Sequence, residues 1–271
     1  MKIAIIQMDI AFGDPEANRR YVKQQVEQAV AEETIDLFVL PELWTTGYDL
    51  ARFDQIAEQS GEITIGFIAK LAKQYQVNFV AGSIANAKET GYYNTLIVID
   101  RQGELIKQYD KVHLFRLMEE EKFLQQGSID GLFTIDDQQA AAVICYDIRF
   151  PEWVRTHMLN GAKVLFVVAE WPKPRIDHWR TLLISRAIEN QCYVVACNRI
   201  GEDPNNMFGG HSMVIGPWGE IIAEADDQAM TLLANITWEE VDRVRKEIPV
   251  YQDRRTELYQ SLDGFKKNRQ I

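Results

Sequence analysis

Short apolar runs alternate with longer amphipathic segments along almost the whole chain, and this alternation restricts the possible folds most. In the first half, the runs at residues 3–7, 35–40 and 77–84 predict strands, and segments 14–33 and 63–75 have helical spacing. Asp14 and Pro15 suit the N-cap and the first turn of the first helix. Elements in this order are typical of an α/β protein.

Hairpin signals interrupt the alternation and predict antiparallel pairs within the sheets. Arg101-Gln102-Gly103 joins the predicted strands 94–100 and 104–109, and Gly216-Pro217-Trp218-Gly219 joins 212–215 and 220–225. Further strands are predicted at 140–144, 164–168, 191–197 and 231–236, with helices at 151–160, 177–190 and 238–246. Roughly twelve strands are too many for one open sheet. We therefore expect two mixed sheets packed together, each covered outside by helices.

Composition excludes several classes of partner. The 271 residues contain no linker or low-complexity run, so we expect one domain over 1–271, large enough to fold without a disulfide or a structural metal. A net charge of −11 argues against nucleic acid as a partner and gives no reason to expect an anionic membrane. No apolar stretch approaches the ~18–20 residues of a membrane span, and the N-terminus does not resemble a signal peptide. Three cysteines make a disulfide framework improbable and favour the cytoplasm.

Three polar residues come directly after predicted strands, where α/β proteins place their sites. These are Glu42, Lys111 and Cys145. Cys145 falls between a strand and a helix that starts near Pro151, and such a turn exposes a nucleophile beside backbone N–H groups. A buried cysteine that serves as a small hydrophobe is the common alternative, and it suits the other two cysteines, at 192 and 197. No CxxC or HxxxH spacing supports a metal site, and no cofactor is expected.

A thiol needs a neighbouring base or cation before it can attack at neutral pH. Glu42 could accept its proton and later pass it to a leaving amine, and Lys111 could favour the thiolate and stabilise an oxyanion. Taken singly, each residue is better explained as a solvated loop charge or as part of a salt bridge. His113, two residues beyond Lys111, is the remaining candidate base and would make a cysteine–histidine hydrolase.

Taken together, three segments resemble the Glu, Lys and Cys motifs of the nitrilase superfamily of carbon–nitrogen hydrolases, in the same order. They are Leu40-Pro41-Glu42-Leu43, Tyr109-Asp110-Lys111-Val112-His113-Leu114-Phe115 and Ile144-Cys145-Tyr146-Asp147-Ile148-Arg149-Phe150-Pro151. The resemblance implies a four-layer αββα sandwich, Glu42 as general base, Lys111 as the stabiliser of the tetrahedral intermediate, and a thioester on Cys145. It also implies a second glutamate after the lysine, and counting back from Gly127 selects Glu120 from the run 119–121.

Within the superfamily the chain looks most like the ω-amidases, through His113-Leu114-Phe115-Arg116 and Glu170-Trp171-Pro172 among other segments. That likeness implies hydrolysis of the terminal amide of 2-oxoglutaramate or 2-oxosuccinamate. Because such substrates carry a carboxylate, we expect an arginine at the pocket, with Arg149 the first candidate and Arg116 the second. An ion pair on the surface is the alternative for both. Aromatic residues expected at the substrate, with core packing as their alternative, are Tyr48, Phe115, Tyr146 and Trp171.

Other activities remain open at this point. The same three residues could hydrolyse an N-carbamoyl amino acid or a nitrile, and Glu170 adds an acid that weighs against a strictly anionic substrate. A non-catalytic scaffold is the hypothesis from a different class, although a scaffold has no reason to keep Glu42, Lys111 and Cys145. The resemblance also implies a homodimer, in which the polar tail at about 250–271 contacts the partner subunit.

Overall fold

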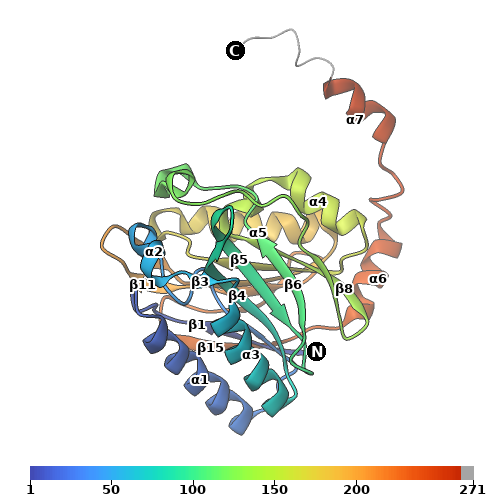
Figure 1. The fold of residues 1–271 in the computed structure, drawn as a ribbon. Coiled ribbons are helices and arrows are strands. Elements are labelled where there is room, and N and C mark those ends of the chain that lie inside the picture. Colours follow the sequence, from blue (N-terminus) through green and yellow to red (C-terminus); the bar gives the residue numbers. More distant parts are fainter. Residues whose placement is uncertain (264–271) are drawn as a thin grey trace.

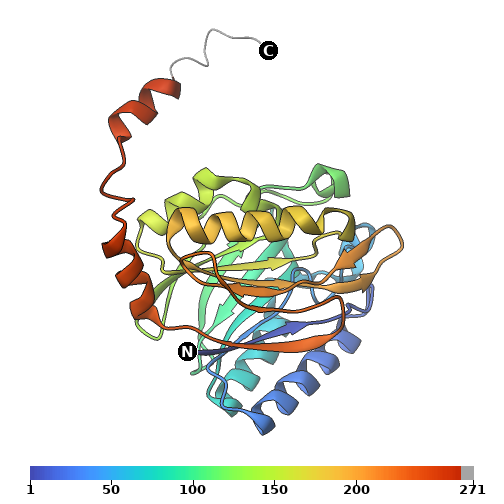
Figure 2. The same ribbon diagram turned by 180° about the vertical axis from the view of Figure 1, so that it is seen from behind.

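Two mixed β-sheets lie face to face between two pairs of helices, as the computed structural model of the chain shows (Figure 1). The structure describes residues 1–263. Helices α1 (Pro15–Glu32) and α3 (Glu62–Tyr75) cover the outer face of one sheet, and α4 (Pro151–Leu159) and α5 (Ile176–Asn190) cover the other (Figures 1 and 2). The predicted four-layer αββα sandwich is therefore confirmed.

The first sheet is parallel in its centre and antiparallel at both edges. Its strands lie in the order β15 (Met230–Asn235), β1 (Lys2–Gln7), β2 (Leu37–Val39), β4 (Asn78–Lys88), β5 (Gly91–Ile99) and β6 (Leu105–Asp110), and β3 (Glu58–Gln59) also pairs with β4. Strands β1, β2 and β4 run parallel, whereas β5 and β6 form the predicted hairpin. The parallel strands end at one edge, where β2 leads into Glu42.

The second sheet repeats this arrangement. Its order is β14 (Ile221–Glu224), β13 (Met213–Ile215), β10 (Tyr193–Asn198), β9 (Val164–Ala169), β8 (Gln138–Ile144) and β7 (Leu132–Ile135). Strands β8, β9 and β10 are parallel, and β13 and β14 form the second predicted hairpin. A separate small hairpin of β11 (Ile200–Glu202) and β12 (Met207–Gly209) was not predicted.

The alternation of side chains along each strand explains why the sheet is buried on both faces. On β1, Ile3 and Ile5 join the core between the two sheets, whereas Ala4 and Ile6 join the core that α1 and α3 cover. Strand β5 alternates in the same way. Because both faces need apolar side chains, these strands are almost continuously hydrophobic, as buried sheets usually are.

The ends of the helices follow their sequence signals. Asp14 caps α1 by accepting a hydrogen bond from the Ala17 N–H at 3.0 Å, and Pro15 opens the first turn. The remaining helices are short: η1 (Leu50–Arg52), α2 (Phe53–Ile56), η2 (Arg116–Met118), η3 (Glu120–Lys122), η4 (Cys145–Arg149), η5 (Lys173–Arg175), α6 (Trp238–Glu247) and α7 (Thr256–Asp263). None of the helices described combines the length and the apolar character needed to cross a bilayer.

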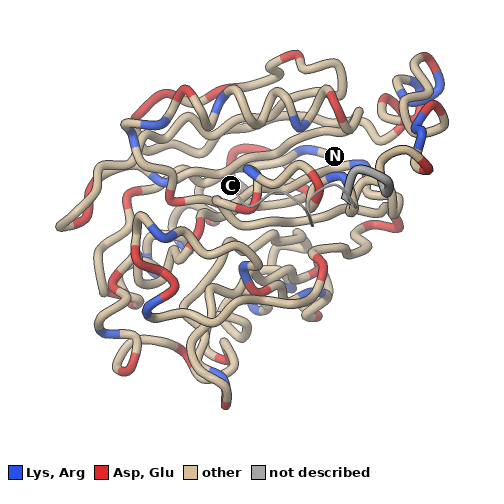
Figure 3. Tube along the Cα trace, turned by 90° about the horizontal axis from the view of Figure 1, so that it is seen from above, with Lys and Arg blue, Asp and Glu red and all other residues tan. Residues whose placement is uncertain are grey.

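The surface carries charges of both signs. Figure 3 shows acidic and basic positions interspersed along the trace rather than separated onto different layers. Helix α7 stands apart from the layers and follows an extended segment after α6 (Figures 1 and 2). Of the tail predicted at 250–271, residues 264–271 lie outside the described part of the chain.

Candidate active site

Glu42 lies in the turn after β2, and its side chain is completely buried. The neighbouring strand must leave room for this turn. Gly82 on β4 has a φ of +60°, and a Cβ there would lie 2.1 Å from the Pro41 carbonyl oxygen. Only glycine suits both the left-handed conformation and the close approach. Ser83 Oγ then accepts a hydrogen bond from the Leu43 N–H at 2.9 Å, which holds the turn against β4.

Lys111 follows β6 and is also fully buried. Its backbone is held on both sides, because its N–H donates to the Asn94 carbonyl and its carbonyl accepts from the Gly127 N–H, each at 2.9 Å. The ammonium donates from Nζ to Glu42 Oε1 at 2.8 Å and to Glu120 Oε1 at 2.6 Å. The structure therefore brings Glu42, Lys111 and Glu120 together, although 69 residues separate Glu42 from Lys111.

Among the three glutamates at 119–121, only Glu120 points into this cluster. It is fully buried in η3, and its Oε2 accepts a hydrogen bond from the Phe115 N–H at 2.6 Å. Its neighbours on both sides are exposed, and Glu119 pairs with Lys122. The chain turns twice through short 3-10 segments here, and these turns separate one glutamate from the other two.

Tyr48 and Asn94 complete the contacts around the two carboxylates. The Tyr48 hydroxyl lies 2.9 Å from Glu42 Oε1 and 2.6 Å from Glu120 Oε1, and Asn94 Nδ2 donates to Glu42 Oε1 at 2.8 Å. Tyr48, which was predicted at the substrate, lies between the two glutamates, beside Lys111. Lys111 Nζ is 3.4 Å from its hydroxyl, the longest of the ammonium's three contacts. That loosely held N–H is the one free to turn toward a developing oxyanion.

Cys145 begins η4, directly after β8, in a left-handed conformation with φ of 45°. Non-glycine residues seldom adopt this conformation, and those that do are concentrated at functional sites. Burial is the main cause that raises the pKa of the thiol well above its ordinary value; Glu42 raises it further, and Lys111 opposes both. The resting group is therefore a thiol, which needs a base at the moment of attack.

Asp147 anchors the nucleophile turn to the end of the lysine strand. Its buried carboxylate accepts hydrogen bonds from the Ile144 and His113 backbone N–H groups at 3.0 Å each and from the Tyr109 hydroxyl at 2.7 Å. The His113 ring contacts the same carboxylate through Nδ1 at 2.7 Å and stacks on Phe150. His113 thus pairs with Asp147, and among the described residues no hydrogen bond joins its ring to Cys145.

Charges around Lys111 keep it protonated. Burial by itself would lower the pKa of Lys111, but Glu120 and Glu42 raise it well above its ordinary value. Burial raises the pKa of Glu120, although Lys111 opposes this effect. Burial and the two carboxylates also keep the pKa of Tyr48 well above its usual range, so its hydroxyl remains a donor.

A small pocket opens at the Cys145 thiol. It is lined by Phe115, Cys145, Tyr146, Arg149, Trp171, Pro172 and Arg175. The Arg149 guanidinium lies 4.7 Å from the centre of the Trp171 ring, and the Arg175 guanidinium lies 5.8 Å from that of Phe115. Both arginines line this one pocket. Desolvation, and to a smaller extent Arg175, lowers the pKa of Arg149.

The other arginine of this pocket, Arg175, was not among the candidates from the sequence. Arg116 is exposed in η2 and is not among the lining residues. The Phe115 N–H donates to Glu120 Oε2, and the chain turns outward directly after this hydrogen bond. Arg175 takes the corresponding place. Its backbone carbonyl accepts from Trp171 Nε1 at 2.7 Å, which holds η5 against the pocket. The spacing Trp171-Pro172-x-x-Arg175 was the available signal, since a proline beside a buried tryptophan marks the turn.

The arrangement offers a nucleophile and a pair of guanidinium groups at one pocket, with a buried carboxylate and ammonium whose charges act on the thiol. Among residues 1–263, no group of three or more His, Cys, Asp or Glu side chains could hold a metal ion. A buried carboxylate beside a protonated thiol can accept its proton, and the ammonium can stabilise negative charge on oxygen. These are the components that acyl transfer through a thioester requires.

Comparison with known proteins identifies the family to which the chain belongs. The family model described as carbon–nitrogen hydrolase covers residues 2–246. The chain belongs to the carbon–nitrogen hydrolase family. Among its relatives, the protein named 2-oxoglutaramate amidase from Bacillus subtilis (strain 168) is 48% identical over 257 residues, which cover 95% of this chain and 98% of the relative. The protein named omega-amidase YafV from Escherichia coli (strain K12) is 35% identical, covering 93% and 96%.

Solved structures of carbon–nitrogen hydrolases share the fold. A superfamily member from Xanthomonas campestris superposes with a TM-score of 0.88 at 30% identity, covering 94% of this chain and 97% of that one. A nitrilase-superfamily member from Saccharomyces cerevisiae gives a TM-score of 0.87 at 29% identity, covering 94% and 96%. The family predicted from the three motifs is thus confirmed, and the chain is a carbon–nitrogen hydrolase.

Proposed function

We propose that this carbon–nitrogen hydrolase cleaves the terminal amide of a small anionic substrate, 2-oxoglutaramate first and 2-oxosuccinamate second, through a thioester on Cys145. The observation that carries the proposal is the pair Arg149 and Arg175 at the pocket that opens onto Cys145. Guanidinium groups bind carboxylates in a fixed, bidentate geometry. The relatives named 2-oxoglutaramate amidase and omega-amidase support the same substrate class.

In the acylation half, Cys145 Sγ attacks the amide carbon as its proton passes to Glu42. The oxygen gains negative charge, which the loosely held N–H of Lys111 stabilises. Collapse of this intermediate breaks the carbon–nitrogen bond, and Glu42 returns the proton to the departing nitrogen. Ammonia leaves, and the acyl group remains on the sulfur as a thioester.

In the deacylation half, water attacks the thioester carbon while Glu42 accepts one of its protons. The carbon–sulfur bond then breaks, and the sulfur recovers the proton from Glu42. The products are the carboxylic acid and ammonia, and the site returns to its starting protonation. Glu120 and Tyr48 do not exchange protons in this scheme. They hold Lys111 and Glu42 in place through the contacts at 2.6 and 2.9 Å.

A substrate panel tests the proposal. Ammonia release would be measured from 2-oxoglutaramate, 2-oxosuccinamate, a neutral amide of the same length, an N-carbamoyl amino acid and a simple nitrile. We expect the two ω-amides to give the highest kcat/KM, with Cys145→Ser as the inactive, folded control. Arg149→Met and Arg175→Met should each raise KM for the ω-amides about 10-fold or more and leave the neutral amide little affected. Preference for the carbamoyl compound or the nitrile would refute the substrate assignment.

A covalent intermediate separates the enzyme from a scaffold. Mass spectrometry of wild-type protein quenched during turnover should show the acyl group on Cys145. If every amide leaves the thiol unmodified, the non-catalytic alternative gains support. If His113→Ala abolishes acylation while Lys111→Met does not, a cysteine–histidine mechanism replaces the one proposed.

We further propose that the chain acts as one domain in a cytoplasmic homodimer, with its tail against the partner subunit. Helix α7 has 8 residues, which is too short for stability in isolation, and it stands apart from the layers (Figures 1 and 2). The three free, buried cysteines suit a reducing compartment. Light scattering of the full chain and of a chain ending at residue 250, together with cell fractionation, would test both statements.

A further inference from the structure

Glu170, at the end of β9, contacts the proposed base directly. Its backbone N–H donates to Glu42 Oε2 at 2.8 Å. This is the oxygen that does not bind Lys111, because Lys111, Tyr48 and Asn94 all contact Oε1. The backbone of Glu170 therefore fixes the orientation of the carboxylate that must accept the thiol proton.

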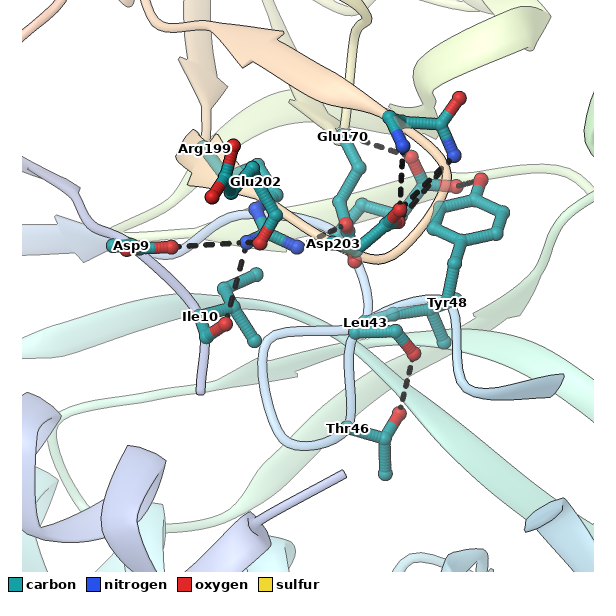
Figure 4. A network of polar contacts seen from close by, with 12 residues as sticks. Asp9, Ile10, Leu43, Thr46, Tyr48, Glu170, Arg199, Glu202 and Asp203 are labelled. Carbon is teal, nitrogen blue, oxygen red and sulfur yellow. Dashed lines mark hydrogen bonds and ion pairs between the residues drawn. The ribbon is translucent and has the colours of Figure 1, made fainter. Parts of the chain in front are cut away.

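The side chain of Glu170 is completely buried and only half satisfied. Its Oε2 accepts a hydrogen bond from Arg199 Nη1 at 2.8 Å, whereas Oε1 has no partner among the described residues. Arg199 lies between Glu170 and Asp9, and its other N–H groups donate to Asp9 and to backbone carbonyls (Figure 4). A buried carboxylate oxygen without a donor is costly, whereas a protonated carboxyl group carries no net charge.

The balance of charges around Glu42 also favours a protonated Glu170. Three fully buried carboxyl groups, Glu42, Glu120 and Glu170, face two fully buried cations, Lys111 and Arg199. One excess negative charge remains if every group is ionised, and a proton on Glu170 removes it. Burial raises the pKa of Glu170 to about 8; Arg199 opposes this rise, and Glu42 and Asp203 add to it.

We propose that Glu170 is a positioning residue for Glu42, whose backbone amide orients the base and whose side-chain charge controls how readily Glu42 accepts the proton of Cys145. The inference rests on the base role of Glu42 in the proposed function. The charged or titratable groups that face Glu170 are Arg199, Glu42, Asp203 and Tyr48, with Asp9 beyond Arg199.

The direction of the effect follows from where the negative charge moves. Proton transfer from Cys145 to Glu42 carries one negative charge from the carboxylate to the sulfur. Glu170 contacts Glu42, whereas burial, Glu42, Lys111 and Glu120 are the leading influences on the thiol. An ionised Glu170 therefore favours this proton transfer, because the transfer moves negative charge from Glu42, which Glu170 contacts, to the sulfur of Cys145. A neutral Glu170 gives no such assistance.

The rate of alkylation of Cys145 by iodoacetamide, followed from about pH 6 to pH 10, tests the inference without any substrate. Wild-type protein should show a rise near pH 8 from Glu170, whereas burial raises the pKa of the thiol so far that its own ionisation contributes only at higher pH. The first rise should be about tenfold, because only the difference between the repulsion of negative charge on Glu42 and on the sulfur contributes, at an effective dielectric constant near 20. Glu170→Gln keeps the backbone amide and the size of the side chain, and should lose this first rise near pH 8.

Asp203→Asn provides a second variant with a different expected outcome. Asp203 raises the pKa of Glu170, so its replacement should move the first rise to lower pH without abolishing it. Asparagine also preserves the hydrogen bonds that the Asp203 side chain accepts within its own turn. Cys145→Ser identifies the labelled residue, and peptide mass spectrometry confirms the site.

Each result supports or overturns the inference. Loss of the first rise in Glu170→Gln together with its shift in Asp203→Asn supports it. An unchanged rise near pH 8 in Glu170→Gln, the same fractional loss at every pH, or no rise near pH 8 in the wild type overturns it. Failure of the substrate assignment is distinguishable, because the alkylation profile does not depend on which amide the enzyme hydrolyses.

Discussion

Replacing Lys111 with methionine should destabilise the folded protein in a way that depends strongly on pH. Lys111 is the cation that both Glu42 and Glu120 contact, at 2.8 and 2.6 Å. Methionine keeps most of the volume and removes the charge. The two carboxylates would then share one buried space without a counter-ion, and proteins relieve such a conflict by protonating the groups.

The size of the effect can be worked from this protonation. The ordinary pKa of a glutamate carboxyl group is near 4.5. Keeping such a group protonated costs about 1.4 kcal/mol for each pH unit above that pKa. At pH 7 the cost is about 3.4 kcal/mol per group, and at pH 5 it is below about 1 kcal/mol. Breaking a buried ion pair typically costs 3–5 kcal/mol. We therefore expect a loss of about 3–7 kcal/mol at pH 7 and of about 1–2 kcal/mol at pH 5.

The sign of this pH dependence follows from the linkage between protonation and folding. In the variant, the folded-state pKa of the buried carboxyl groups lies above the unfolded value, so their contribution is fully favourable at low pH and is lost as pH rises. Urea denaturation of the wild type and Lys111→Met at pH 5, 6 and 7 measures it. The double variant Lys111→Met/Glu120→Gln contains one buried carboxylate fewer and should recover about half of the loss at pH 7. A penalty that is the same at pH 5 and pH 7, or no recovery in the double variant, would refute the reasoning.

Three further changes give separate predictions. Gly82→Ala places a Cβ 2.1 Å from the Pro41 carbonyl oxygen at a φ of +60°. It should therefore lower the free energy of unfolding by about 1–3 kcal/mol and lower kcat by at least about tenfold. Wild-type values in both the denaturation and the steady-state assays would contradict the close approach. Tyr48→Phe removes the hydroxyl between the two glutamates and should lower kcat by about 10- to 100-fold; an unaltered kcat would show that the hydroxyl is dispensable. Asp147→Ala leaves hydrogen-bond donors of Ile144, His113 and Tyr109 without an acceptor. We therefore expect a loss of about 3 kcal/mol or more in the free energy of unfolding, measured by denaturation, and slower alkylation of Cys145, measured by labelling. If neither effect is found, Asp147 does not anchor the nucleophile turn.

The fold was predictable because its signals are local, whereas the catalytic residues were predicted from their places after strands and from the resemblance of three motifs. Apolar runs of strand length, hairpin glycines and the Asp14-Pro15 cap each report on a few neighbouring residues, and they were enough to predict the two sheets and the outer helices. The ends of strands were less certain. Strand β4 continues to Lys88, beyond the predicted end at residue 84, because its pairing with β5 extends to Gly91. Pairing between distant segments, rather than local propensity, determined that boundary.

The substrate pocket was less predictable because it depends on where turns point after the motifs end. Arg149 lies within the cysteine motif and Arg116 directly follows the lysine motif, yet only Arg149 of these two lines the pocket. Arg175 reaches it through η5 and the hydrogen bond between its carbonyl and the Trp171 indole. No pattern of apolar and polar residues reports the direction of such a turn, which is set by one or two hydrogen bonds.

Glu170 shows how far a residue's environment can change its interpretation. From the sequence it was an acid that weighed against an anionic substrate. In the structure its carboxyl group binds Arg199, and Glu170 is not among the residues that line the pocket. A carboxyl group that is buried, half satisfied and largely protonated near neutral pH does not repel an anion as an exposed carboxylate would. The objection to an anionic substrate therefore disappears, and the charge of Glu170 becomes relevant to the base that it contacts.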